Sequence, residues 1–348
     1  MRPIAEAYKD FPILHKEHNG HRVIYLDSGA TAQIPQSVID RVVEHMTQRN
    51  GNPHRGSHIL AIEASEDYEN ARDRVVEFIN AREREEVVFT RNSTESMNLI
   101  AHSYGLHNVK KGNKIVITVA EHHANLVTWQ YVAEQTGATL EYMYLDEHGH
   151  LKDGEINKID ENTKIVAFAH VSNVLGMEFP VKELTEKAHS VGAVVVLDGA
   201  QSTPHKKIDV QELDCDFFVF SGHKMCASQG IGVLYGKREL LEAMPPFLLG
   251  GDMIEYVKEQ TTTFNELPYK FEAGTPNADG AVSLHAAIDY LESFGMDAIE
   301  AYEEELVAYI LPKIVALPHV HVIGSQNPKE KHGVIAFTVD DVHPHDVA

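Results

Sequence analysis

Short apolar runs alternate with amphipathic stretches along this chain, and that alternation most constrains its fold. Polar or Gly-rich segments bound each run, and stretches such as Val181–Val191, where apolar residues recur every three or four positions, separate them. The pattern predicts an α/β fold, a mostly parallel sheet flanked by helices, with an antiparallel strand at Gly230–Tyr235. The other expected strands are Glu86–Thr90, Lys114–Thr118, Thr163–Ala169, Ala193–Asp198 and Phe217–Ser221.

The pattern changes after Thr275, where two long helices and then two short strands are expected. We therefore expect a large domain at residues 26–278 and a small α+β domain at residues 279–348, to which residues 1–25 contribute an N-terminal segment. The chain stops at Ala348, where another helix is expected to begin, so we expect the small domain to be incomplete. The expected C-terminal elements are helices Asp279–Phe294 and Met296–Ala316 and strands His319–Ile323 and Gly333–Val339.

Charge and composition exclude several classes of function. The chain carries 30 Lys and Arg against 52 Asp and Glu, a net charge of −22, which disfavours nucleic acid and anionic membranes as partners. The N-terminus lacks the pattern of a secretory signal, no apolar stretch is long enough to span a membrane, and two cysteines suit a reducing compartment. We therefore expect a cytoplasmic protein. No metal site is expected, because no Cys or carboxylate cluster joins the 22 histidines at zinc-site spacing.

An acid and a lysine follow two of the expected strands. Ligands of α/β sheets bind beyond the carboxyl ends of the strands. Asp198 ends one apolar run, and His223 and Lys224 follow another. A carboxylate keeps the ring nitrogen of pyridoxal 5'-phosphate (PLP) protonated, and a lysine forms the Schiff base, so the pair predicts a PLP site. By itself, Lys224 could also be a solvated surface lysine.

Polar residues at the other strand ends could complete such a site. Ser93 and Thr94 stand at a helix start, where free N–H groups attract phosphate, although helix capping alone selects the same residue types. His123 could stack on the cofactor ring, shuttle a proton or be purely structural. Asn173 and Gln201 could hydrogen-bond the ring oxygen or the substrate.

Six ordered motifs together resemble a known family. LDGAQS, FSGHK followed by GIGVLYG, EHHAN, HVSNVLG, NPHRGSH and FEAGTPN are similar to motifs of the class V aminotransferases, specifically the SUF-type (group II) cysteine desulfurases. The resemblance covers nearly the whole chain from YLDSGATAQIP onward. It implies a PLP-dependent transferase fold of the aspartate aminotransferase type.

The resemblance also implies roles for the residues around the cofactor ring. Lys224 would carry PLP as a Schiff base, and Asp198 would pair with the protonated ring nitrogen. His123 would stack on the ring, while Gln201 and Asn173 would hold its oxygen side.

The phosphate end would involve two copies of the chain. Thr94, Ser221 and His223 would bind the phosphate, to which the helix start at Ser93 also points. In such enzymes the FEAGTPN segment reaches across a dimer interface, so Thr275 would contact the phosphate held by the other subunit. The resemblance therefore implies a homodimer.

The implied activity converts L-cysteine, or a related amino acid, to L-alanine and passes its sulfur to an acceptor protein of the SUF system for iron–sulfur cluster assembly. The family's nucleophilic cysteine lies in a C-terminal segment resembling R-x-G-H-H-C, and its substrate-binding arginine lies there too. Neither occurs in this sequence, and Cys215 and Cys226 are expected to be packing residues. We therefore expect this chain to be inactive or impaired. A selenocysteine lyase, another class V aminotransferase and a non-catalytic PLP-binding dimer are the alternatives.

Overall fold

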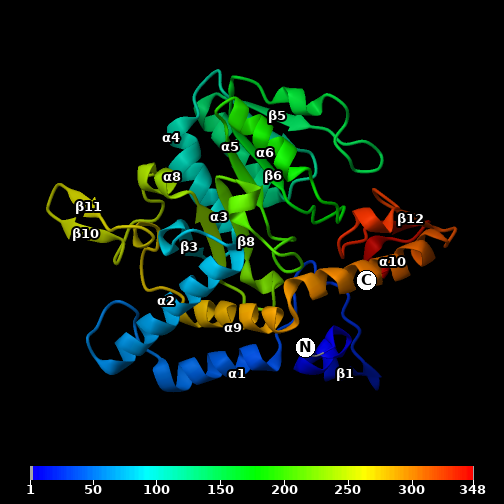
Figure 1. Cartoon of the computed structure of the whole chain (residues 1–348), viewed down its shortest axis with the longest axis horizontal. Helices are drawn as coiled ribbons and strands as arrows, with labels where there is room; N and C mark the ends of the chain where they lie inside the picture. Colours follow the sequence, from blue (N-terminus) through cyan, green and yellow to red (C-terminus); the bar gives the residue numbers. More distant parts are fainter. Residues whose placement is uncertain (1–2, 348) are drawn as a thin grey trace.

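The computed structural model describes residues 3–347 and is built around a seven-stranded sheet covered by helices (Figure 1). Strand β9 runs antiparallel to both of its neighbours, and all other neighbouring strands pair in parallel. The mostly parallel sheet and its antiparallel strand are thus confirmed, and only β5 was not predicted. In spatial order the strands are β3 (Val87–Thr90), β9 (Gly232–Gly236), β8 (Phe217–Ser221), β7 (Val194–Asp198), β6 (Thr163–Ala169), β4 (Lys114–Thr118) and β5 (Thr139–Met143).

Side chains of the central strands alternate between two apolar layers, one on each face of the sheet. In β6, Val166 and Phe168 belong to one layer, and Ile165 and Ala167 belong to the other. All four are fully buried. Because both faces are covered, apolar residues follow one another without alternation in these strands, as in residues 165–169, and this explains the continuous apolar runs in the sequence.

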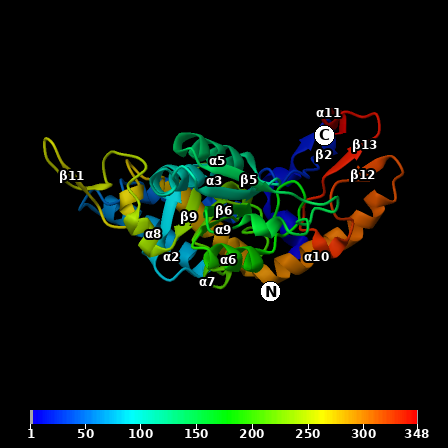
Figure 2. The same ribbon diagram turned by 90° about the horizontal axis from the view of Figure 1, so that it is seen from above.

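Two sets of helices cover the two faces of the sheet. Helices α2 (Ile59–Ile79), α6 (Val181–Ser190) and α9 (Ala278–Phe294) supply buried side chains to one layer, and α3 (Ser93–Leu99) and α5 (His123–Thr136) supply them to the other. In Figure 2 the two sets lie on opposite sides of the sheet. None of the helices within residues 3–347 is long and apolar enough to cross a membrane.

Further elements surround this core. The further α-helices are α1 (Gln36–Glu44), α4 (Leu106–Asn108), α7 (Val210–Leu213), α8 (Arg238–Ala243), α10 (Met296–Val315) and α11 (Pro344–Val347). Three antiparallel strand pairs complete the described structure: β1 (Glu17–His18) with β2 (His21–Arg22), β10 (Ile254–Val257) with β11 (Thr262–Phe264), and β12 (Val320–Val322) with β13 (Phe337–Val339).

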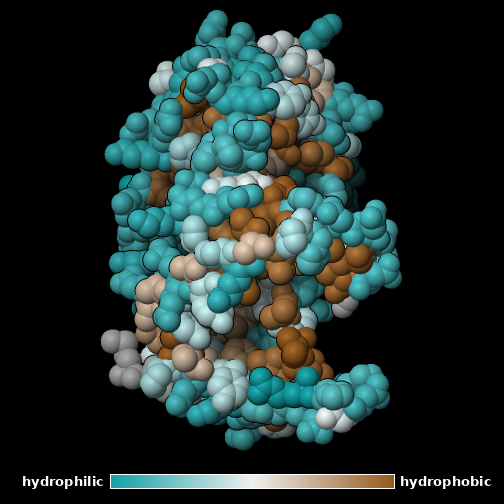
Figure 3. All heavy atoms as spheres, turned by 90° about the vertical axis from the view of Figure 1, so that its right-hand side faces the viewer, coloured by the Kyte–Doolittle hydropathy of each residue, from teal (hydrophilic) through white to brown (hydrophobic). Residues whose placement is uncertain are grey.

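The C-terminal elements lie to one side of the main sheet (Figure 1). α9 packs on α1 and α2, so the predicted boundary at residue 278 falls at the start of a helix that contacts the preceding segment. α10, β12 and β13 project beyond it, next to the N-terminal helical segment Ile4–Asp10. Figure 3 shows apolar side chains gathered on this face of the molecule. The division into domains remains a prediction.

The predicted strand Gly333–Val339 is only partly formed, because β13 begins at Phe337. Gly333 has the left-handed φ of 58°, and the N–H of Val334 donates to the carbonyl of His332 at 2.5 Å. This turn directs the backbone away from the strand and toward Gly176, whose carbonyl accepts the N–H of His332.

Gly199, directly after β7, tests how tightly the sheet is packed. A Cβ at this position would lie 2.0 Å from Cζ of the fully buried Phe218. We expect Gly199→Ala to lower the free energy of unfolding by roughly 3 kcal/mol, because the buried ring has little room to move. The guanidinium unfolding midpoint measures this loss. Gly250→Ala is the control, since its Cβ would meet only Ala273 at 3.8 Å. Equal midpoints for the two variants would contradict the packing argument.

Candidate active site

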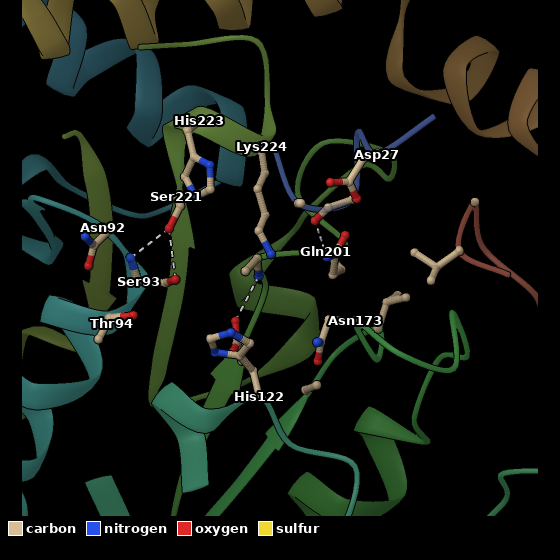
Figure 4. A pocket seen from close by; sticks show the side chains of 18 of the residues that line it. Asp27, Asn92, Ser93, Thr94, His122, Asn173, Gln201, Ser221, His223 and Lys224 are labelled. Carbon is tan, nitrogen blue, oxygen red and sulfur yellow. Dashed lines mark hydrogen bonds between the residues drawn. The ribbon is translucent and has the colours of Figure 1, made fainter. Parts of the chain in front are cut away.

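A cavity of about 630 Å³ opens at the carboxyl ends of the central strands (Figure 4). Register aligns these ends, since Ala169 of β6 lies beside Asp198 of β7, and Asp198 lies beside Val219 of β8. The residues that follow each strand therefore converge on one space. All the predicted site residues except His123 and Thr275 line this cavity; they are Ser93, Thr94, Asn173, Asp198, Gln201, Ser221, His223 and Lys224.

Asp198 and Lys224 face one environment that is poor in water. Asp198 is only 6% exposed, and its Oδ1 accepts the N–H of Ala200 at 3.0 Å. Burial raises the pKa of Asp198 above its ordinary value, although Ala200 and the charge of Lys224 oppose the rise. Burial likewise lowers the pKa of Lys224, and Asp198 opposes that change. A lysine with a lowered pKa is more often unprotonated, which makes its amine a better nucleophile toward a carbonyl group.

His122, and not His123, lines the cavity. Because α5 begins at His123, His122 occupies the N-cap position with extended backbone, and its Nδ1 accepts the N–H of Ala124 at 3.1 Å. Burial lowers the pKa of the His122 imidazole, which favours its neutral form. His123 lies in the first helical turn and does not line the cavity. The ring contact predicted for His123 stays untested, and we propose His122 in its place, because of the two only His122 lines the cavity.

Ser93 and Thr94 are not needed to cap their helix. The cap of α3 is Asn92, whose Oδ1 accepts the N–H of Glu95 at 2.9 Å. Ser221 joins the helix start to β8, because its Oγ accepts the N–H of Ser93 at 2.8 Å and donates to the Oγ of Ser93 at 2.9 Å. Capping alone thus does not account for the Ser93 and Thr94 hydroxyl groups at the cavity.

Residues near the N-terminus close the cavity from another side. Thr31 Oγ1 lies 2.6 Å from Nδ1 of His223, and Nε2 of Gln201 donates to the carbonyl of Gly29 at 2.8 Å. These contacts orient the His223 ring and leave Oε1 of Gln201 as an acceptor. Residues 27–31 carry no catalytic residue type in a recognisable pattern, although they belong to the YLDSGATAQIP motif, and were therefore not predicted at the site.

Thr275 lines a different cavity, together with Glu272 and Asn277. Its predicted contact with the phosphate in another subunit therefore stays a prediction.

Glu121 is a buried acid that the sequence analysis missed. Its two carboxyl oxygens accept from Thr118 Oγ1 at 2.5 Å and from Asn125 Nδ2 at 2.7 Å. Burial raises the pKa of Glu121 to about 8, against these hydrogen bonds, and the charge of Asp198 adds to the rise. Glu121 is thus predominantly protonated at neutral pH. Its neutral carboxyl group does not repel the carboxyl group of Asp198.

The family assignment agrees with this site. A model of the Aminotransferase class-V family matches residues 24–348. The chain therefore belongs to the class V aminotransferase family, as its motifs predicted, and its cofactor is PLP.

Several proteins that are similar to this chain are named as cysteine desulfurases. The chain is 51% identical to a probable cysteine desulfurase of Halalkalibacterium halodurans over 99% of this chain and 84% of that protein. It superposes with a TM-score of 0.93 on the apo structure of a cysteine desulfurase from Thermococcus onnurineus, at 40% identity over 100% of this chain and 85% of the other. The cysteine desulfurase CsdA from Escherichia coli gives a TM-score of 0.88 at 37% identity, over 98% and 84% of the two chains.

The groups around the cavity fit PLP. In Figure 4, Ser93, Thr94 and Ser221 gather on one side of Lys224, and Gln201 and Asn173 lie on the other. Hydroxyl groups suit a phosphate, amides suit a ring oxygen, and the buried Asp198 suits a protonated ring nitrogen.

The raised pKa of Glu121 predicts a pH-dependent stability. The unfolded chain loses this proton near the ordinary value of 4.5, whereas the folded chain holds it up to about 8. Between these values the folded state binds more protons, so the group's contribution falls as pH rises, by about 1.4 kcal/mol per pH unit. Glu121→Gln should flatten the decline between pH 5.5 and 7.5, measured by chemical unfolding. The exposed Glu161→Gln is the control. Parallel curves for Glu121→Gln and the unchanged protein would refute the buried, protonated acid.

Proposed function

We propose that this chain is a PLP-dependent cysteine desulfurase that removes sulfur from L-cysteine and leaves L-alanine. The observation that carries the proposal is the convergence of Lys224 and Asp198 on one cavity, in a chain 51% identical to a probable cysteine desulfurase. The sulfur would pass to an acceptor protein of the SUF type for iron–sulfur cluster assembly.

When bound, PLP supplies an electron sink for negative charge that develops at the substrate Cα. Lys224 would hold the cofactor through Nζ and would also move the proton at the substrate Cα, a role that the lowered pKa of its amine favours. Asp198 would hold the proton on the ring nitrogen. His122 would lie against the ring face and keep water from it.

The remaining predicted residues would bind the ends of the cofactor. Ser93, Thr94, Ser221 and His223 would hold the phosphate. Gln201 and Asn173 would hold the oxygen side of the ring.

We propose a homodimer in which Thr275 completes the phosphate site of the other subunit. Its place in a second cavity, apart from the residues that face Lys224, is compatible with that arrangement.

Sulfur transfer by the route of the cysteine desulfurases needs a reactive thiol, and neither cysteine of this chain supplies one. Cys215 and Cys226 are both buried, and burial raises the pKa of each thiol, that of Cys226 to about 12. Cys226 also adopts a left-handed φ of 68°, which fixes it in the turn after Lys224. A thiolate is the reactive form, so both are unsuited to attack the substrate sulfur. We propose that these 348 residues are inactive or impaired in sulfur transfer unless an acceptor thiol comes from outside them.

The burial of both cysteine thiols favours a second candidate function. A lyase, including one that acts on selenocysteine, cleaves the bond at Cβ without a protein thiol and would use the same Lys224 and Asp198. Release of free sulfide or selenide without a protein-bound persulfide would distinguish it.

The Schiff base assignment predicts the spectrum of a variant. Lys224→Ala should lose the near-visible absorption band of the PLP-loaded protein, because Lys224 is the one lysine among the described residues that lines the cavity. The control is the exposed Lys207→Ala, which should keep the band. An unchanged band in Lys224→Ala would sink the cofactor assignment.

The buried thiols predict low reactivity. We expect neither Cys215 nor Cys226 to react with a colorimetric disulfide reagent in the native protein within minutes, and both to react after unfolding, because the thiolate is scarce and inaccessible. Rapid labelling of one thiol before unfolding would show that it is available to accept sulfur.

A further inference from the structure

One wall of the cavity comes from the far C-terminal part of the chain. Gly333–Ile335 line the same cavity as Lys224. In Figure 4 this red segment lies on the side that carries Asn173, away from Thr94 and the proposed phosphate end. An amino acid bonded to the cofactor would therefore extend its side chain toward a region that this segment borders.

The wall rests directly on the loop that carries Asn173. The N–H of His332 donates to the carbonyl of Gly176 at 2.6 Å. Gly176 has a φ of +62°, and a Cβ there would lie 2.3 Å from the carbonyl oxygen of Val334. The backbone of Gly176 thus contacts the backbone of residues 332–334 directly, so a shift of the loop that contains Gly176 would also shift Gly333–Ile335.

A buried lysine fastens the two segments. Lys331 is only 1% exposed, and its Nζ donates to the carbonyl of Leu175 at 2.7 Å and to that of Ile323 at 2.9 Å. Both acceptors are neutral, and burial lowers the pKa of Lys331. A buried ammonium group is stable only where it makes hydrogen bonds. The two carbonyl groups therefore hold Lys331 in place, and with it the following residues 333–335.

Glu178 holds the wall from the other end of the loop. Its carboxylate lies 3.4 Å from Nε2 of His332, 3.2 Å from Nε2 of His170 and 2.5 Å from Nζ of Lys206. Burial alone would raise the pKa of Glu178, but the hydrogen bonds from these three side chains lower it, so the group stays ionised.

Helix α10 supports the wall from behind. Lys206 also contacts Glu300 at 3.1 Å, and His205 Nδ1 lies 2.7 Å from Oε2 of Glu303. A Cβ on Gly333 would meet that same Glu303 oxygen at 2.5 Å. The helix thus contacts the wall on one side and the residues after Gln201 on the other.

We propose that Lys331 and Glu178 are positioning residues that fix Gly333–Ile335 as the substrate-side wall, and that this wall limits the size of the amino-acid side chain accepted. The inference rests on the proposed function, because it assumes an amino acid bonded to PLP. It assigns amino-acid selection to a surface separate from the groups that hold the cofactor.

The test separates amino-acid binding from cofactor binding. Lys331→Met keeps much of the side-chain volume and removes the ammonium, and Glu178→Gln removes the charge. In the PLP-loaded proteins, titration of the near-visible band with L-alanine gives the amino-acid dissociation constant. We expect a rise of about tenfold in both variants, with less than a twofold change in PLP affinity. Lys329→Met and Glu304→Gln, both exposed and on neighbouring segments, should behave as the unchanged protein does.

Val334→Ala tests the same wall with little risk to folding, because it removes only two methyl groups. We expect the ratio of L-norvaline to L-alanine affinity to rise about fivefold, since the shorter Ala side chain leaves more space for the longer side chain of L-norvaline. Unchanged amino-acid affinity in Lys331→Met together with an unchanged ratio in Val334→Ala would overturn the inference while leaving the cofactor site intact. Absence of the band from the unchanged protein would overturn the proposed function and this inference with it.

Discussion

The burial of the Asp198 carboxyl group at the end of a central strand is the constraint on which the site depends. A carboxylate in the interior is costly unless a positive charge and hydrogen bonds compensate for it. The chain provides Lys224 and the N–H of Ala200 on the cavity side. Burial and the charge of Asp198 raise the pKa of Glu121, so Glu121 keeps its own proton and adds no negative charge near Asp198. A protonated ring nitrogen would supply the remaining compensation when PLP is bound.

Two parts of the cavity differ in how they are built. The cofactor side belongs to the central sheet, whose strands β6, β7 and β8 are paired in register and buried on both faces. The other side is assembled from residues of three segments, 26–30, 171–173 and 333–335, which are far apart in the sequence. Paired strands are rigid, whereas the second side is held by contacts of the buried Lys331 and by the ion pairs of Glu178.

Much of the cofactor side was predictable from the sequence. Strands buried on both faces leave continuous apolar runs, and their ends mark Asp198 and Lys224 without knowledge of the third dimension. The sequence does not define the exact residue at which a helix begins. Only the backbone structure therefore shows that His122, and not His123, lines the cavity. Glu121 gave no usable signal, because a glutamate after a strand is ordinarily solvated and only the packing of α5 against the sheet buries it.

The wall formed by Gly333–Ile335 could not be predicted at all, and the sequence pattern even favoured a strand there. The sequence by itself determined the α/β architecture, the family and the lysine proposed to hold the cofactor, because these depend on local periodicity and on motifs of neighbouring residues. The tertiary structure alone decided the charge of Glu121, the histidine at the cavity and the contacts of Lys331, because burial and ion pairing depend on residues brought together from distant parts of the chain.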